Sequence, residues 1–451
     1  MTTLKMPKAV INFSLKCSVI YFSVLPIVYG VELSADLYSG LEYTNNAKFA
    51  TTATIEDVSQ TLGLNVLLKE QRKRFNVDAS FNVEEEHYYN NTYTNQTSLT
   101  TGFGIFNFDI IENFLDWRTS FTRTETLRSS LSKNTPNNRA RRNILRSGPN
   151  VTYRINRAST LGFSANYISV ENSAPQTADT KRADGNVAYN YALNSATSFS
   201  INGKYDEVIG GARASGLKNI NVNLGVIRAF SHGEMSFNYG RTQSRSSLSN
   251  TVAGNFYNLS FIRQQLFWHD ISLQYTQDIS DTSIGFKSSE QGSLLGGGGT
   301  PVNSNGGSNI GGNSLGVVTG LDILKKRQFN VSISRVIESY QYNVSGFWSD
   351  LNYKVQHNDE RSYGLSLQLS RNISSSLSAG ILYSHSIDDF LDRPAFGKET
   401  TNTYRLNGGY VLSKKLDMST YIQFEGREDD RYQIREYEEF STGVTLKWAI
   451  L

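Results

Sequence analysis

The histidines and their neighbours are the first residues to consider for chemistry. The chain has five His residues, and none is spaced from another His or from Cys as a zinc site requires. His87 follows the acidic run 84–86 at an expected strand end, which favours a solvated strand tip over a weak cation site. Ser384 and Ser386 flank His385, but no base and orienting residue match them as a catalytic triad requires. The sequence predicts no enzyme, no metal site and no cofactor.

Two further motifs have a chemical and an ordinary interpretation. The glycine run 296–299 lacks the Lys-Ser/Thr pair that follows in a phosphate-binding loop, so we interpret it as a flexible linker. Arg139, Arg141 and Arg142 end a long polar segment. Guanidinium groups there would suit the phosphates of lipopolysaccharide or an anionic polymer, and an ordinary charged rim is the alternative.

The first 30 residues predict a secretory signal. Lys5, Lys8 and Lys16 precede the apolar run 17–28. Small residues after this run allow cleavage between Gly30 and Val31. A membrane anchor is the alternative, although the run is short for a span. The segment holds three Lys and no acid, so its removal leaves 41 basic against 41 acidic residues. This balance gives no argument for nucleic-acid binding.

The single cysteine, Cys17, lies in the same segment, so the exported chain holds no disulfide. Its composition, with 12% aromatic residues, argues against disorder. No stretch after residue 30 reaches the roughly 18 apolar residues of a membrane helix.

Strict alternation of apolar and polar residues dominates the rest of the chain and predicts strands. In one segment the apolar members are Phe75, Val77, Ala79, Phe81 and Val83. About twenty such segments occur, mostly about 10 to 15 residues long, which exceeds soluble strands and fits tilted strands across a bilayer. Short connections such as 70–73, 194–196 and 413–415 alternate with long polar ones such as 44–56, 125–141 and 388–398.

These features predict an all-β fold: a transmembrane antiparallel up-and-down β-barrel of about 20 strands, within a range of roughly 18 to 22. Residues 31–451 would form this single domain, with short periplasmic turns and long extracellular loops. The Gly/Ser/Asn-rich segment 279–320 is expected to be a flexible extracellular or pore-mouth loop. A soluble sandwich or propeller also alternates, and remains the alternative fold.

A barrel separates two kinds of side chain. Lipid must cover the apolar face, because an Arg or Lys there costs roughly 2 to 4 kcal/mol at the bilayer midplane. Charged residues of opposite parity are then predicted to line the lumen, as a transverse field or as a salt-bridged wall: Asp78, Glu84, Asp116, Arg118, Arg182, Asp184, Arg405, Glu425, Arg427, Arg435, Glu439 and Lys447.

Aromatic residues and the chain end add to this prediction. Aromatic side chains near strand ends suit interfacial girdles; these are Tyr43, Tyr88, Trp117, Tyr153, Tyr205, Trp268, Tyr353 and Trp448. Gly443, Leu446 and Trp448 are similar in spacing to the C-terminal signal of outer-membrane barrels, although three residues follow the Trp where the aromatic is commonly last. We therefore expect the barrel assembly machinery as a partner.

The chain resembles the outer-membrane putative porins associated with exopolysaccharide and PEP-CTERM protein-sorting systems. The resemblance lies in the segments 43–47 (YTNNA), 109–117 (DIIENFLDW), 146–151 (RSGPNV) and 324–333 (LKKRQFNVSI). It implies an outer-membrane location in a Gram-negative bacterium and a link to surface-polysaccharide production or export. It carries over no functional residues.

The predicted function is therefore a porin-like conduit linked to export or assembly of exopolysaccharide. A non-conducting scaffold for surface polymers or proteins is the alternative. Expected partners are outer-membrane lipid and lipopolysaccharide, together with a polysaccharide substrate or export proteins, and no nucleic acid.

Overall fold

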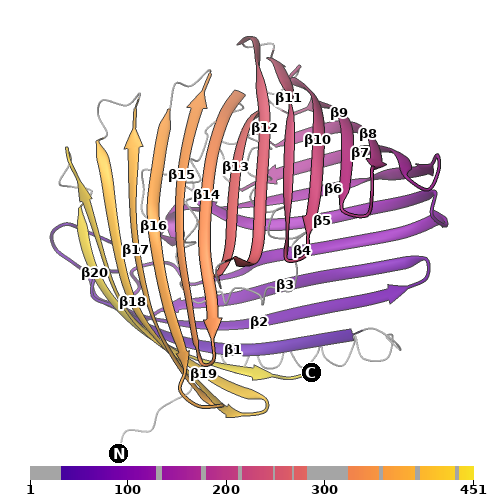
Figure 1. Ribbon diagram of the computed structural model, residues 1–451. Coiled ribbons are helices and arrows are strands. Elements are labelled where there is room, and N and C mark those ends of the chain that lie inside the picture. The colour runs from indigo at the N-terminus through magenta and orange to yellow at the C-terminus, as the bar shows by residue number, and fades with distance from the viewer. Residues whose placement is uncertain are drawn as a thin grey trace, which may run out of the picture.

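The computed structural model describes residues 32–451 apart from 128–134, 174–178, 212–215, 247–248, 267–268, 282–322, 355–358, 392–396 and 432–435. These residues form a single sheet of 20 strands (Figure 1). The strands are β1 (Glu32–Thr44), β2 (Asp57–Arg72), β3 (Phe75–Tyr88), β4 (Gln96–Ile111), β5 (Leu115–Leu127), β6 (Arg139–Arg154), β7 (Ser159–Asn172), β8 (Thr180–Ala192), β9 (Thr197–Gly210), β10 (Lys218–Phe230), β11 (Gly233–Ser246), β12 (Ser249–Leu266), β13 (His269–Asp281), β14 (Ile323–Ile337), β15 (Tyr340–Tyr353), β16 (Glu360–Asn372), β17 (Leu377–Phe390), β18 (Lys398–Ser413), β19 (Leu416–Asp429) and β20 (Tyr437–Ala449).

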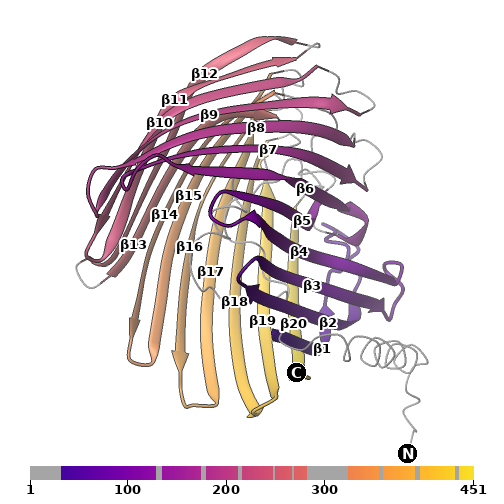
Figure 2. The same cartoon turned by 90° about the vertical axis from the view of Figure 1, so that its right-hand side faces the viewer.

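The sheet closes on itself. Each strand pairs antiparallel with its neighbour in the chain, and β20 pairs with β1 from Asp36↔Ala449 to Thr44↔Ser441. Figure 2 shows the strands wrapped into one barrel. A short 3-10 turn, η2 (Pro136–Asn138), precedes β6. Closure satisfies the ladder of every strand, which lipid cannot do for an open edge. The predicted antiparallel barrel of about twenty strands is confirmed.

The register aligns apolar residues across neighbouring strands. Leu37 on β1 lies opposite Leu64 on β2, which lies opposite Val83 on β3. Because side chains alternate along a strand, this alignment gives one continuous apolar face. We call it the outer face, and the opposite one the inner face.

The outer face exposes large apolar side chains on every side of the barrel. Examples from different strands are Leu41, Phe106, Phe163, Leu224, Leu365, Leu406 and Leu446, between 40% and 57% exposed. Soluble proteins rarely expose so large an apolar area to water. We therefore infer that this face contacts the hydrocarbon of a membrane. The soluble alternatives place such residues in a core, which the structure does not.

Turns and loops separate to the two ends of the barrel. At one end, the turn end, β2 and β3 are joined by two residues, and β18 and β19 by Lys414 and Lys415. Longer connections such as 45–56 and 89–95 lie at the other end, the loop end. This asymmetry is that of outer-membrane barrels.

Several predicted boundaries shift because strands extend past the membrane-spanning pattern. Residues 125–127 and 139–141 belong to β5 and β6 rather than to a loop, and 279–281 belong to β13. The predicted signal segment 1–30 and the rest of the predicted loop 279–320 lie outside the described residues. Among the described residues, no helix has the length and apolar composition needed to cross a membrane.

The predicted aromatic girdle is correct in part. Trp117, Tyr153 and Trp448 are exposed on the outer face near the turn end. Tyr88 and Tyr353 instead face inward, where Tyr353 packs with Leu324 and Leu351. Both tyrosines lie at strand ends on the loop end of the barrel. There, being close to a strand end does not indicate whether a side chain faces inward or outward.

Candidate functional site

The inner face of the barrel is the candidate functional site. The contacts of Tyr38 on β1 show which face this is. Its ring lies over Gly63 of β2, and its hydroxyl reaches β3. There it donates to Asn82 Oδ1 at 2.9 Å and contacts the Glu84 carboxylate. This contact spans three strands on the face opposite the exposed apolar rows.

The strand register places the candidate lumen residues on this inner face. They are Asp78 and Glu84 on β3, Asp116 and Arg118 on β5, Arg182 and Asp184 on β8, Arg405 on β18, and Glu425 and Arg427 on β19. Arg435 lies outside the described residues. These side chains line different arcs and do not converge on one point. Their role in lining an open channel stays a prediction.

One arc of the inner face, from β6 to β9, is an ion-paired network. Arg146 Nη2 lies 2.7 Å from Asp184 Oδ2, and Asn166 donates to the same carboxylate. Arg182 Nη2 lies 2.6 Å from Asp206 Oδ1, and both side chains are almost fully buried. A buried pair holds its geometry because losing either partner leaves a buried charge. This arc therefore follows the salt-bridged interpretation of the mixed charges.

A second arc, from β18 through the closure to β3, is rich in carboxylates. We call it the acidic seam; its inward acids include Asp36, Glu42, Asp78, Glu84, Glu86, Glu399, Glu425 and Glu439, against the inward bases Lys69, Arg405, Arg427 and Lys447. Two bases pair directly: Lys447 Nζ lies 2.9 Å from Asp36, and Arg427 Nη1 lies 3.4 Å from Glu399. Acids outnumber bases in the seam.

Hydroxyl groups satisfy several carboxylates of the acidic seam. Thr44 donates to Glu439 Oε1 at 2.7 Å. Tyr437 and Thr403 donate to the two oxygens of Glu425, at 2.5 and 3.2 Å. A neutral donor stabilises a carboxylate without cancelling its charge. The seam therefore has an excess of carboxylates over bases that the β6–β9 network does not have.

A third arc, from β9 to β13, carries mostly amides and hydroxyls on its inner face, beside a few charged side chains such as Lys204 and Asp278. Asn202 donates to Asn223 Oδ1 at 3.1 Å, and Asn223 donates to Asn221 Oδ1 at 2.7 Å. Asn221 donates to Thr242 Oγ1 at 2.6 Å, and Thr242 donates to Asp278. We call this chain of side chains the amide wall. In the strand order, β10 and β11 stand half of the circumference away from β20 and β1.

Sequence reasoning from charge missed the amide wall and the role of Tyr38. Asn202, Asn221 and Asn223 follow the same inward parity as the charged candidates, so alternation was a sufficient signal for them. The contact of Tyr38 with β3 needed the register across Gly63, which no single segment reveals. Arg142, which the sequence predicts at the end of a long loop, is buried on the inner face. Arg139 lies 3.4 Å from Glu86.

His385, the histidine that two serines flank in the sequence, does not lie beside them in the structure. His385 lies on the outer face and its Nδ1 is 2.8 Å from Asn402 Oδ1. Ser384 and Ser386 point to the opposite face, so the sequence neighbours are separated by the sheet. No group of three His, Cys, Asp or Glu side chains within the described part of the chain is arranged to hold a metal ion.

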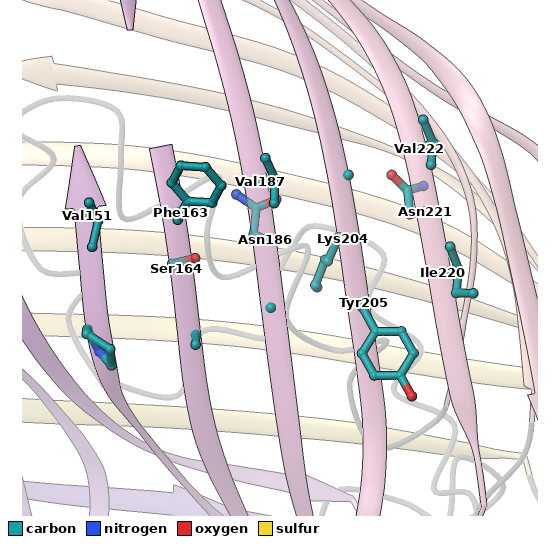
Figure 3. A pocket seen from close by; sticks show the side chains of 14 residues that line it. Val151, Phe163, Ser164, Asn186, Val187, Lys204, Tyr205, Ile220, Asn221 and Val222 are labelled. Carbon is teal, nitrogen blue, oxygen red and sulfur yellow. The ribbon is translucent and has the colours of Figure 1, made fainter. Parts of the chain in front are cut away.

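A hollow of about 620 Å³ lies on the outer face, not in the lumen. Figure 3 shows Val187, Tyr205, Ile220 and Val222 around it on β8, β9 and β10. It forms where small residues replace large ones at adjacent positions, namely Ala165, Gly185 and Gly203. Its walls are apolar and face lipid, so it offers no chemistry to an aqueous solute.

No family model matches the chain, and no curated protein sequence matches it. Among solved structures it is similar to a mutant of the ferric enterobactin receptor of Pseudomonas aeruginosa, with 10% identity, 94% of this chain and 81% of that chain covered, and a TM-score of 0.50. It is also similar to the outer membrane channel DcaP of Acinetobacter baumannii, with 10% identity, coverage of 93% and 97%, and a TM-score of 0.41. A third is OpdQ of Pseudomonas aeruginosa, with 8% identity, coverage of 94% and 100%, and a TM-score of 0.41.

At these identities the likeness is one of fold alone. The physical features of the chain carry the assignment: a closed antiparallel sheet with an even strand number, an apolar outer face, and turns and loops at opposite ends. The chain is an outer-membrane β-barrel of the Gram-negative type.

Proposed function

We propose that the barrel is a porin-like aqueous conduit that favours cations and uncharged hydrophilic solutes over anions. Barrels of about 16 to 18 strands already leave an aqueous channel, and this sheet has 20. The observation that carries the proposal is the contrast between the acidic seam and the facing amide wall. A solute would pass between a surface rich in carboxylates and a mostly uncharged hydrogen-bonding one.

The acidic seam supports the preference for cations. Hydrogen bonds donated by Thr44, Thr403 and Tyr437 favour the ionised form of the carboxylates that accept them. Charged walls with low-dielectric surroundings focus the field into the aqueous space and raise the local concentration of the opposite ion. Anions would meet repulsion on this side of the barrel.

The amide wall supports the link to polysaccharide that the sequence resemblance implies. Amides supply both donors and acceptors, which suits the hydroxyl groups of an uncharged sugar chain. The acidic seam disfavours a polyanionic polymer. We therefore propose that any exopolysaccharide handled by this barrel is uncharged.

Conductance in planar bilayers tests the conduit directly. The purified barrel should give step conductances. In a KCl gradient at pH 8, the reversal potential should have the sign that cation selectivity produces. A barrel that inserts without conductance would contradict the conduit and favour the non-conducting scaffold. An anion-selective channel would contradict the role assigned to the acidic seam.

A matched pair of variants locates the selectivity. Glu42→Gln with Glu425→Gln and Glu439→Gln removes three inward carboxylates and should reduce cation selectivity. Glu428→Gln removes an outward carboxylate on the same strand as Glu425 and should leave selectivity unchanged. Equal effects of the two changes would contradict the assignment.

A further inference from the structure

The outer face of β14, β15 and β16 carries an aromatic row close to the loop end. Phe329, Trp348 and Tyr363 lie side by side in the register of these strands. Aromatic rows of this kind mark the boundary between hydrocarbon and headgroups in outer-membrane barrels. The next outward residues toward the loop end therefore lie at headgroup level.

A charged row follows at that level. Arg327, Asp350 and Arg361 are aligned two residues further toward the loop end, which is roughly 6 to 7 Å along a strand. Lys325 follows Arg327 on the same face, and Asp389 lies across from Arg361. Three bases thus stand with two acids at a depth where headgroup phosphates lie.

The guanidinium groups of this row lie near a carboxylate but do not form a direct hydrogen bond with it. Asp350 lies between them, 3.7 Å from Arg327 Nη1 and 3.8 Å from Arg361 Nε. Both distances are too long for a direct hydrogen bond. The two arginine side chains are 40% and 45% exposed, while Arg327 Nε is buried. The exposed guanidinium N–H groups can therefore donate to an acceptor from the membrane side.

We propose that Lys325, Arg327 and Arg361 form a binding site for the phosphate groups of lipid A in the outer leaflet. Guanidinium binds phosphate through two parallel hydrogen bonds, and Lys adds a point charge. The two arginines stand on strands two positions apart, about 9.5 Å by strand spacing. That separation suits a headgroup with two phosphates better than a phospholipid with one. Asp350 holds the two guanidinium groups apart.

The outer rim near the loop end has a different charge on another arc of the barrel. On the outer face of β19, β20 and β3, the residues near the loop end include Glu428, Glu438 and Glu85. Carboxylates repel phosphates, so lipid A would approach the β14–β16 arc in preference to the acidic one. The proposal requires the outer-membrane location and does not depend on conduction.

Lipid binding to the delipidated barrel in detergent tests the site. Native mass spectrometry would follow titration with bisphosphorylated lipid A, with phosphate-free lipid A and with phosphatidylglycerol. The variant Lys325→Gln/Arg327→Gln/Arg361→Gln should bind bisphosphorylated lipid A at least about tenfold more weakly than the unaltered barrel. Phosphate-free lipid A should bind both proteins weakly.

The matched control is Arg335→Gln/Arg371→Gln, which removes outward arginines of β14 and β16 at the turn end. It should keep the affinity for lipid A within about twofold. The heat-modifiable gel shift confirms that each variant is folded. Unchanged affinity in the first variant, an equal loss in the control, or phosphatidylglycerol binding as tight as lipid A would each overturn the proposal.

Discussion

The ring of Tyr38 occupies the space above Gly63, so that a Cβ added to Gly63 would collide with the ring. The same ring reaches Asn82 and Glu84 on the next strand. One side chain therefore ties β1, β2 and β3 together beside the closure of the barrel. The glycine is required here by close approach, not by its backbone conformation.

Gly63→Ala should destabilise the barrel by about 1 to 3 kcal/mol, because the added methyl must displace a packed ring. Urea unfolding in lipid vesicles, followed by tryptophan fluorescence, measures the change. Gly203→Ala is the matched control, since its Cβ would meet nothing within 4 Å. In a Tyr38→Ala background the cost of Gly63→Ala should largely vanish. An equal cost in both backgrounds would show that the ring is not the cause.

The buried ion pair of the β6–β9 network predicts a large loss. Arg182→Met leaves Asp206 buried without its cation and should cost about 3 to 5 kcal/mol in the same unfolding measurement. Lys218→Met breaks a pair of similar length, 3.0 Å to Glu207, that is far more exposed. It should cost less than about 1 kcal/mol. Similar losses in the two variants would mean that burial does not set the strength of these pairs.

The C-terminal strand predicts an assembly effect. Trp448 and Trp117 are both outward near the turn end, 52% and 42% exposed. Each Trp→Ala change should reduce stability in lipid by a similar amount. Only Trp448→Ala should lower the amount of barrel in the outer membrane, measured by fractionation and immunoblot, because only this residue belongs to the predicted assembly signal. Equal depletion by both variants would argue against that signal.

Alternation, the length of the segments and the order of short and long connections together predicted the closed antiparallel barrel and its approximate strand number. Alternation also predicted the face of charged residues such as Asp184 and Arg405. The partners across strands could not be predicted, since the pairing of Arg182 with Asp206 depends on the register across a bulge between β8 and β9. The amide wall was not predicted from charge, because Asn and Thr side chains carry none.

Aromatic residues at strand ends show the same limit. Tyr153 and Tyr353 both follow the alternating pattern, yet one is 54% and the other 3% exposed. The apolar body of a tyrosine suits lipid and its hydroxyl suits a polar interior. Residue type alone therefore cannot decide which face of the barrel a tyrosine at a strand end occupies.

The central claim is that one face of each strand lies in hydrocarbon and the other in water. Asn221 and Val222 are adjacent on β10 and point to opposite faces, and the sequence has only one cysteine, in the predicted signal. Spin labels on Asn221→Cys and Val222→Cys, in lipid vesicles, test the claim by their collision rates with oxygen and with a water-soluble nickel reagent. The label at 221 should collide more with nickel and the label at 222 more with oxygen. The reverse order, or equal access of nickel to both, would contradict the account.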